Sequence, residues 1–189
     1  MEKKTDIRSR YTQGIIKQAY LELLQTKSSK NITVAEICKK TDINRGTFYN
    51  HFVDIQDVQE HLENELFAQV EKALNENDAS ALNLDFYLNA IEIINDNRVL
   101  FASVFSNIQG NIFFQKLIAY SKEKYIHDFT VSFPDVPQSE IDAMFTYILH
   151  GSLGLLSDWF LKNDGSKPND IAKRICDFNN TIINALKKQ

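Results

Sequence analysis

The sequence predicts an all-α protein of about nine helices, a three-helix head followed by a larger helical body. Apolar residues recur at intervals of three and four along most of the chain, and no segment alternates apolar and polar residues as a half-buried strand does. Only six Gly and three Pro interrupt the 189 residues. The apolar share of 43% and the charged share of 24% are those of an ordinary globular chain, so collagen-like and disordered classes are excluded.

The head is predicted to contain three helices. Apolar residues spaced four apart indicate the first helix over 11–24, and the polar run 26–31 ends it. A capping box, Thr33-Val-Ala-Glu36, opens a short second helix. Asn44 is the expected N-cap of a third helix over 45–52.

From residue 54 onward the pattern predicts longer helices, separated by clusters of Asn, Asp, Gly and Pro. The first of these carries apolar residues at every fourth position from Val58 to Leu74, so it links the head to the body. The predicted helices of the body span 54–75, 85–95, 98–106, 112–131, 137–162 and 168–187.

Charge is distributed unevenly along the chain. The formal net charge is −4, but residues 1–52 contain ten Lys and Arg against five Asp and Glu, whereas residues 53–189 contain eleven against twenty. A basic head on an acidic body suggests that the head meets a polyanion.

Catalytic and metal sites are not expected. The four histidines, His51, His61, His127 and His150, are scattered, and the chain has neither a Cys-x-x-Cys pair nor a glycine-rich phosphate loop. We therefore expect no enzyme activity, no cofactor and no bound metal. No segment approaches the roughly 20 apolar residues that span a bilayer, so we expect a cytoplasmic protein without membrane association.

Residues 33–52 fit the demands of a helix-turn-helix, in which one helix crosses the DNA backbone and the next lies in the major groove. Phe48 and Phe52 lie on the same side of the third helix, where Ile43 can cover them, so this side is expected to pack inward. The opposite side presents Gly46 and Asn50. A purely structural three-helix cap is the alternative that these residues by themselves leave open.

The outward side is chemically suited to DNA. Asn50 can pair with an adenine edge, Arg45 with guanine or phosphate, and the Thr47 methyl group can touch a thymine methyl. Gly46 permits close approach of the backbone, while hydroxyl and imidazole groups can donate to phosphate oxygens. The predicted DNA-binding residues are Thr33, Asn44, Arg45, Gly46, Thr47, Tyr49, Asn50 and His51.

Two segments, Ile32-Thr-Val-Ala-Glu-Ile37 and Asn44-Arg-Gly-Thr-Phe-Tyr-Asn-His-Phe52, resemble the head of the tetracycline-repressor-like (TetR) family. The resemblance covers roughly residues 10–68, and its run Gly-Thr-Phe-Tyr-x-His-Phe is a strong signature. It implies that Thr47, Tyr49 and His51 touch DNA and that Thr33 is a phosphate-contacting cap. The chain departs from the family at the start of the fourth helix, where a phosphate-gripping Lys is common and this sequence has Val53-Asp-Ile-Gln-Asp57.

The resemblance and the motif together predict a sequence-specific DNA-binding transcriptional regulator. We expect a helix-turn-helix DNA-binding domain at 1–53 and a ligand-binding and dimerisation domain at 54–189. The expected partners are a palindromic double-stranded operator, a second copy of the chain, and a small apolar or amphipathic ligand that releases a repressor from DNA. The alternative is a co-regulator of the same fold that acts mainly through a protein partner.

Two groups of residues are predicted in the body. The ligand site is expected to draw on middle-helix aromatics and one histidine, namely Phe101, Phe105, Tyr120 and His150. In proteins similar to this family the two C-terminal helices pair with their copies across a two-fold axis. The residues expected at that interface are Ile148, Gly151, Leu155, Trp159, Ile175, Phe178 and Ile182.

Overall fold

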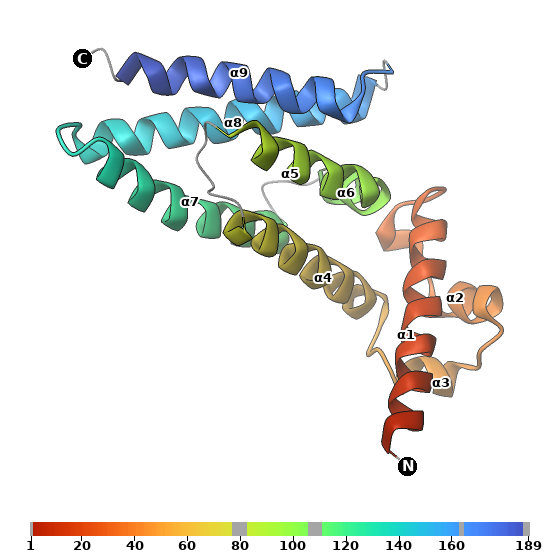
Figure 1. The fold of residues 1–189 in the computed structure, drawn as a ribbon. Helices are drawn as coiled ribbons and strands as arrows, with labels where there is room; N and C mark the ends of the chain where they lie inside the picture. Colours follow the sequence, from red (N-terminus) through yellow and green to blue (C-terminus); the bar gives the residue numbers. More distant parts are fainter. Residues whose placement is uncertain (1, 77–82, 106–110, 163–164, 187–189) are drawn as a thin grey trace. The chain divides into compact units, whose positions relative to one another are not determined.

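The computed structural model describes residues 2–76, 83–105, 111–162 and 165–186. Every regular element in these ranges is helical, with nine α-helices and one short 3-10 helix, so the predicted fold class is confirmed (Figure 1). The helices are α1 (Glu2–Leu24), η1 (Ser29–Asn31), α2 (Val34–Thr41), α3 (Arg45–Tyr49), α4 (Ile55–Glu76), α5 (Leu84–Asp96), α6 (Arg98–Phe105), α7 (Ile112–Ser132), α8 (Gln138–Lys162) and α9 (Pro168–Leu186). Among them, none combines the length and the apolar character that crossing a bilayer requires.

The chain forms two compact units that do not follow the order of the sequence. Unit 1 consists of Met1–Leu66 together with Arg98–Asn107, and unit 2 consists of Phe67–Asn97 together with Ile108–Gln189. Helix α6 belongs to unit 1 because it packs against α1. The functional division at residues 53 and 54 stays a prediction, since compactness of packing does not test it.

Unit 1 is organised around α1, which packs against both α2 and α6. Its core joins residues of α1, α2, α3 and the beginning of α4, and three of them, Ile16, Ile37 and Val58, are fully buried. The remaining buried members of this core are Ala19, Tyr20, Ile32, Cys38, Phe48 and Phe52.

Two polar contacts tie α1 to α4 within unit 1. The Tyr20 hydroxyl donates to Gln59 Oε1 at 2.9 Å, and Gln59 in turn donates to Glu63 Oε1 at 2.8 Å. Burial raises the pKa of Tyr20 well above its ordinary value, so the hydroxyl stays protonated and keeps its donor. Lys17 Nζ lies 2.5 Å from Glu65 Oε1 and adds an ion pair at the protein surface.

Unit 2 is a bundle in which α9 packs on α5 and α8, and α8 packs on α7. One apolar cluster joins α7, α8 and α9 around Phe129, Ile141, Met144 and Ile183. A buried amide, Asn179, donates to the Tyr87 hydroxyl at 2.8 Å and to Ser152 Oγ at 3.1 Å, so α9 is bonded to both α5 and α8. Both cysteines of the chain are buried free thiols.

Candidate nucleic-acid interface

The start of α2 is held by a complete capping box, as the sequence predicts. Thr33 Oγ1 accepts from the Glu36 N–H at 3.4 Å, while Glu36 Oε2 accepts from the Thr33 N–H at 3.1 Å and from its hydroxyl at 2.8 Å. Lys27 also bonds to the Glu36 carboxylate and lowers the pKa of this group, which keeps it ionised. The Thr33 hydroxyl proton therefore has a partner within the protein, and donating it to a phosphate means exchanging that bond.

Helix α3 begins at Asn44, whose side chain is its N-cap. Asn44 Oδ1 accepts from the Thr47 N–H at 2.8 Å and from the Thr47 hydroxyl at 3.2 Å. Satisfying an otherwise unpaired amide of the first turn stabilises a helix by about 1 kcal/mol. The cap leaves the Asn44 amide nitrogen and the Thr47 methyl group as the parts of these residues that DNA could contact.

The inward side of α3 is anchored by two phenylalanines. Phe48 is completely buried and Phe52 is 2% exposed, with their ring centroids 6.0 Å apart. Ile43, in the turn between α2 and α3, packs against the same core. Full burial of an aromatic side chain contributes about 1.5 to 3 kcal/mol or more, so these rings determine which side of α3 faces outward.

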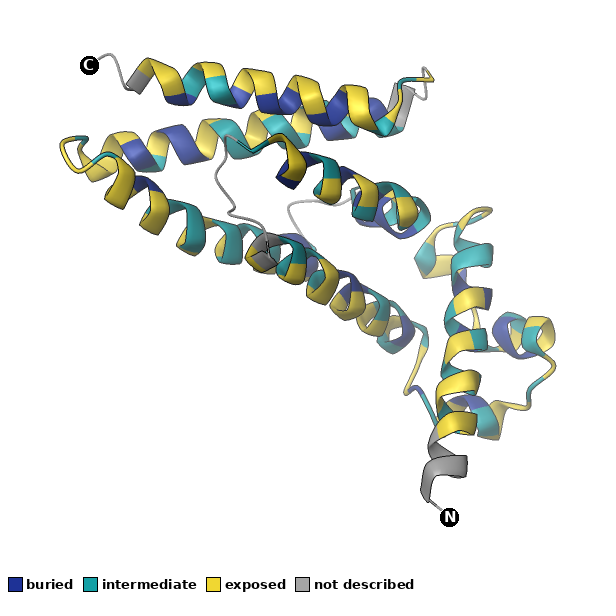
Figure 2. Cartoon of the chain, viewed as in Figure 1, coloured by how far each residue is buried: buried dark blue, intermediate teal, exposed yellow. Residues whose placement is uncertain are grey.

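The outward side of α3 presents the polar residues that the sequence analysis selects. Arg45, Gly46 and Asn50 are exposed, and Tyr49 is 55% exposed with its ring edge-on to the ring of Phe48 (Figure 2). Thr47 is half-buried. The structure thus places these side chains on one accessible surface.

His51 is the predicted DNA-binding residue that also contacts another helix. It is half-buried, and its Nδ1 lies 3.5 Å from Ser9 Oγ of α1. One end of α1 therefore lies beside the end of α3.

Helix α3 is shorter than the predicted helix over 45–52, because its regular part ends at Tyr49. Asn50 keeps helical backbone angles as the C-cap, and its N–H bonds to Gly46 O at 3.0 Å. The His51 N–H then bonds to Phe48 O, three residues back, at 2.9 Å, which tightens the last turn. The Phe52 N–H still reaches Phe48 O at 3.0 Å, so the predicted inward placement of both rings is confirmed although the helix is shorter.

The start of α4 carries two carboxylates that serve as caps. Asp54 Oδ1 accepts from the Asp57 N–H at 2.9 Å, and Asp57 Oδ2 accepts from the Val53 N–H at 2.8 Å. Asp57 also lies 3.1 Å from His61 Nδ1. Acidic side chains stabilise the positive end of a helix. Asp54 and Asp57 therefore have a structural role at the position where the family commonly has a phosphate-binding Lys.

The sequence of the body identifies the family of the chain. Residues 83–181, more than half of the chain, match the family model described as the C-terminal region of TetR-type transcriptional regulators. The chain belongs to the TetR family of transcriptional regulators. Regulators of this family bind DNA and act as dimers, and the family is one of regulators, not of enzymes. No curated protein matches the sequence of this regulator.

Solved structures of other regulators share the fold. A TetR/AcrR-type regulator from Aquifex aeolicus superposes with a TM-score of 0.72 at 16% identity, covering 90% of this chain and 99% of that one. A TetR-family regulator from Syntrophomonas wolfei gives a TM-score of 0.66 at 16% identity, with 92% and 95% covered. The dihydroxyacetone kinase operon activator DhaS gives 0.60 at 18% identity, with 93% and 96% covered. At such identities the likeness shows the fold.

The four residues predicted to bind a ligand have three different surroundings in the regulator. Phe101 and Phe105 belong to unit 1, with ring centroids 6.0 Å apart. Tyr120 belongs to unit 2, where its hydroxyl donates to Asn75 Oδ1 at 2.9 Å. His150 is exposed on α8, and its Nδ1 lies 2.8 Å from Thr146 O. The ligand site stays a prediction.

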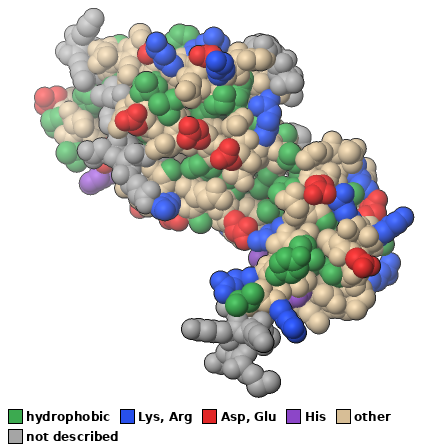
Figure 3. All heavy atoms as spheres, turned by 45° about the vertical axis from the view of Figure 1, so that its right-hand side comes forward, with side chains coloured by type: hydrophobic (Ala, Val, Ile, Leu, Met, Phe, Trp, Pro, Cys, Tyr) green, Lys and Arg blue, Asp and Glu red, His purple; other side chains and the backbone are tan. Residues whose placement is uncertain are grey.

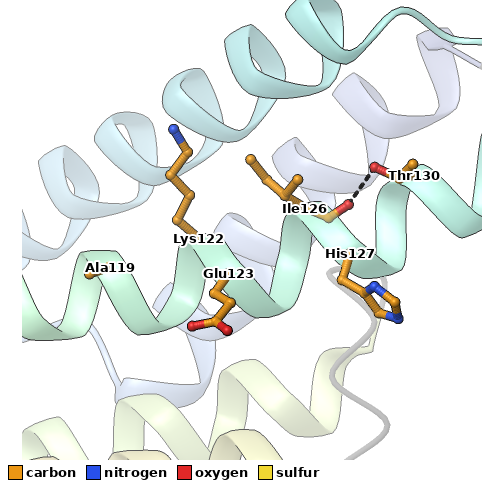
Figure 4. Close-up of a pocket in the computed structure, with 6 residues that line it drawn as sticks. All are labelled: Ala119, Lys122, Glu123, Ile126, His127 and Thr130. Atoms are coloured by element: carbon orange, nitrogen blue, oxygen red, sulfur yellow. Dashed lines mark hydrogen bonds between the residues drawn. The ribbon is translucent and has the colours of Figure 1, made fainter.

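An open hollow lies along α7, and none of the four predicted ligand residues lines it. Its lining residues are Ala119, Lys122, Glu123, Ile126, His127 and Thr130. Figure 4 shows that its side chains diverge: Lys122 points to one side of the helix, whereas Glu123 and His127 point to the other. A specific small-molecule site needs polar groups that converge on an enclosed apolar space. The hollow on α7 lacks that convergence. Among the described residues, no group of His, Cys, Asp and Glu is arranged to hold a metal ion.

The seven residues predicted at a dimer interface divide by burial. Trp159 is 5% exposed, with its Nε1 donating to Ser166 O at 3.0 Å, and Ile175 is 2% exposed. The regulator's own chain covers these two side chains, and their place at a dimer interface stays a prediction. Ile148, Leu155 and Ile182 are half-buried, while Gly151 and Phe178 are exposed.

The sequence analysis missed exposed residues in both units of the regulator. Tyr147 of α8 is 67% exposed and lies four residues before Gly151, so both are on one side of that helix. Tyr11 of α1, the first residue of the helix predicted over 11–24, is 70% exposed. The signal that could have revealed these two is the polar tip of tyrosine, which allows it to stand at a surface.

Proposed function

We propose that the chain is a sequence-specific DNA-binding regulator, in which residues 1–53 bind a palindromic operator and residues 54–189 dimerise and bind a ligand. The observation that carries this proposal is the orientation of α3. Phe48 and Phe52 are buried in the core of unit 1, and the opposite side exposes Arg45, Tyr49 and Asn50. A helix held in this way presents hydrogen-bonding groups to the major groove without losing its packing.

The exposed groups divide into those that can read bases and those that can hold phosphates. The Asn50 amide can bond to both N6 and N7 of adenine, and Arg45 can bond to both O6 and N7 of guanine. The Tyr49 hydroxyl is a donor suited to a phosphate oxygen. The two kinds of contact together give sequence preference and affinity.

Homodimerisation through α8 and α9 is supported by exposed apolar and small residues. Tyr147 and Phe178 are 67% and 55% exposed, so both side chains are accessible to a second copy. A Cβ placed on Gly151 or Gly154 would meet no atom of another described element within 4 Å, so a second helix could approach α8 closely there. Two copies would place two recognition helices on half-sites about 34 to 36 Å apart.

Release by a small apolar or amphipathic ligand would make the protein a repressor that acts in the cytoplasm. A ligand can lower DNA affinity only by binding more tightly to the state whose recognition helices fit DNA poorly, a coupling of about 1 to 3 kcal/mol. Helix α4 is suited to transmit this coupling, because it is continuous from Ile55 to Glu76 and is bonded to α1 through Gln59 and Glu65.

A co-regulator that acts mainly through a protein partner is the second candidate. It is favoured by the start of α4, where Asp54 and Asp57 take the place of a phosphate-binding cation. The structurally similar DhaS is described as an operon activator, so the fold is compatible with activation as well as repression. Direct DNA binding distinguishes the candidates, because log K against log salt falls by about 0.9 for each phosphate neutralised.

The test is selection of duplexes from a random pool by the wild-type protein, followed by binding of the selected duplex to Asn50→Ala. Loss of the Asn50 amide should relax preference at one base pair in each half-site, costing about 1 to 3 kcal/mol there. Asn64→Ala, an exposed Asn of α4 in the same unit, is the matched control and should bind as the wild type does. If the wild type selects no sequence, or if Asn50→Ala keeps the full base preference, α3 is not the reader.

A further inference from the structure

The part of α1 beside α3 carries a basic surface that no DNA-binding motif assigns. Between Ile7 and Leu21, α1 contains Arg8, Arg10 and Lys17 and no acidic residue. Arg8 is exposed, and Tyr11, which lies one turn further on the same helix, is 70% exposed. Figure 3 shows Lys and Arg side chains of unit 1 beside exposed hydrophobic side chains in the lower part of the view.

This surface adjoins the recognition helix. Ser9 Oγ lies 3.5 Å from Nδ1 of His51, which lies two residues after the end of α3. Arg8 and Arg10 are the neighbours of Ser9 in the sequence. Within unit 1, α1 also extends past α3 toward its first residues (Figure 1). The contact of Ser9 with His51 therefore places the part of α1 that carries Arg8 beside the end of α3.

The geometry of the major groove indicates what such a surface would meet. The groove is about 12 Å wide and a helix with its side chains is about 10 to 12 Å across, so α3 would fill it from wall to wall. Groups that lie beside α3 then face the sugar-phosphate walls, where a guanidinium and a phenolic hydroxyl are both suitable donors.

Residues 53–57, at the start of α4, include no cationic side chain that could bind a phosphate. Asp54 and Asp57 are engaged as caps of α4, and Asp57 also faces His61. We propose that Arg8 and Tyr11 of α1 bind the phosphates that flank the bases read by α3, in place of a cation at the start of α4. This inference rests on the proposed DNA binding and adds the side chains that supply its affinity.

The experiment measures the salt dependence of binding to the duplex that the wild-type protein selects from a random pool. Removing one phosphate contact with Arg8→Gln should reduce the slope of log K against log salt by about 0.9, which is about an eightfold loss of affinity at 0.1 M salt. Base preference should not change, and Arg8→Lys should restore most of the slope. Tyr11→Phe should lower affinity with no change of slope, because it removes a neutral donor.

The matched control is Lys116→Gln, which removes the same charge from an exposed position of α7 in unit 2. A duplex carrying single uncharged methylphosphonates then locates the contact, since the linkage that weakens the wild type should leave Arg8→Gln unaffected. If the wild type binds with a salt-dependent slope and Arg8→Gln has the same slope, the inference is overturned and the DNA-binding function stands. If the wild type binds no duplex at all, both fall together.

Discussion

Replacing Gly46 with Ala should have two opposing effects of comparable size on the free energy of unfolding. Ala is favoured over Gly by about 0.8 to 1 kcal/mol in the interior of an exposed helix, and this is the upper limit for Gly46, the second residue of α3. A Cβ on Gly46, however, would lie 3.2 Å from Asn44 Oδ1, the atom that caps α3 by accepting from Thr47. Losing such a cap costs about 0.5 to 2 kcal/mol. We therefore expect Gly46→Ala to change the free energy of unfolding by less than about 1 kcal/mol.

Gly14 is the matched control for this substitution. It lies inside α1, it is exposed, and a Cβ added to it would meet no atom of another described element within 4 Å, so Gly14→Ala should show the whole helical gain. Urea unfolding measures both variants, with the midpoint compared at an unchanged m value. Removing the cap by Asn44→Ala should restore to Gly46→Ala the gain seen at Gly14, as a double-mutant cycle. Equal stabilisation by both glycine substitutions in the wild-type background would refute the proposed conflict with the cap.

Two further substitutions test the structure. Thr33→Ala should lower the free energy of unfolding by about 1 kcal/mol through loss of the α2 cap, whereas Thr33→Ser should keep it; an Ala variant as stable as the wild type in urea would contradict the cap. Burial raises the pKa of Tyr87 from 10.0 to about 12, so the stability from its protonated hydroxyl is complete below pH 10 and is lost as the pH rises toward 12, by up to about 2.7 kcal/mol. The stability difference between the wild type and Tyr87→Phe should therefore shrink between pH 9 and pH 12, and a constant difference would show that the Tyr87 hydroxyl is not buried as described.

The head could be predicted because its determinants are close together in the sequence. The capping box of Thr33 and Glu36, the cap at Asn44 and the pair Phe48 and Phe52 each involve residues three or four positions apart. Such patterns specify both the start of a helix and the side that packs inward. The end of α3 was misplaced because a spacing of four is also compatible with the tighter turn that follows Tyr49.

The helices of the body could be predicted, but the sides of those helices that face the core, the solvent or a second copy could not. Trp159 and Ile175 belong to apolar stripes that the sequence cannot divide between the protein's own core and a second copy. The division depends on contacts distant in the sequence, such as the packing of α9 on α5. Exposed Tyr147 and Phe178 show the same limit, since helical periodicity records hydrophobicity and not the partner that covers it.

Helix α1 contacts both the end of α3, which carries the proposed DNA-binding surface, and α4, which is proposed to transmit ligand binding. Its Ser9 contacts His51 beside α3, while further along the helix Tyr20 bonds to Gln59 of α4. A second contact between α1 and α4, the ion pair of Lys17 and Glu65, is screened by water and salt and is worth at most about 1 kcal/mol. Tyr20 is completely buried, and leaving its hydroxyl unpaired would cost about 1 to 3 kcal/mol. A shift of α4 would therefore move α1 with it before that bond breaks, and α3 would follow because its phenylalanines share the core that α1 covers.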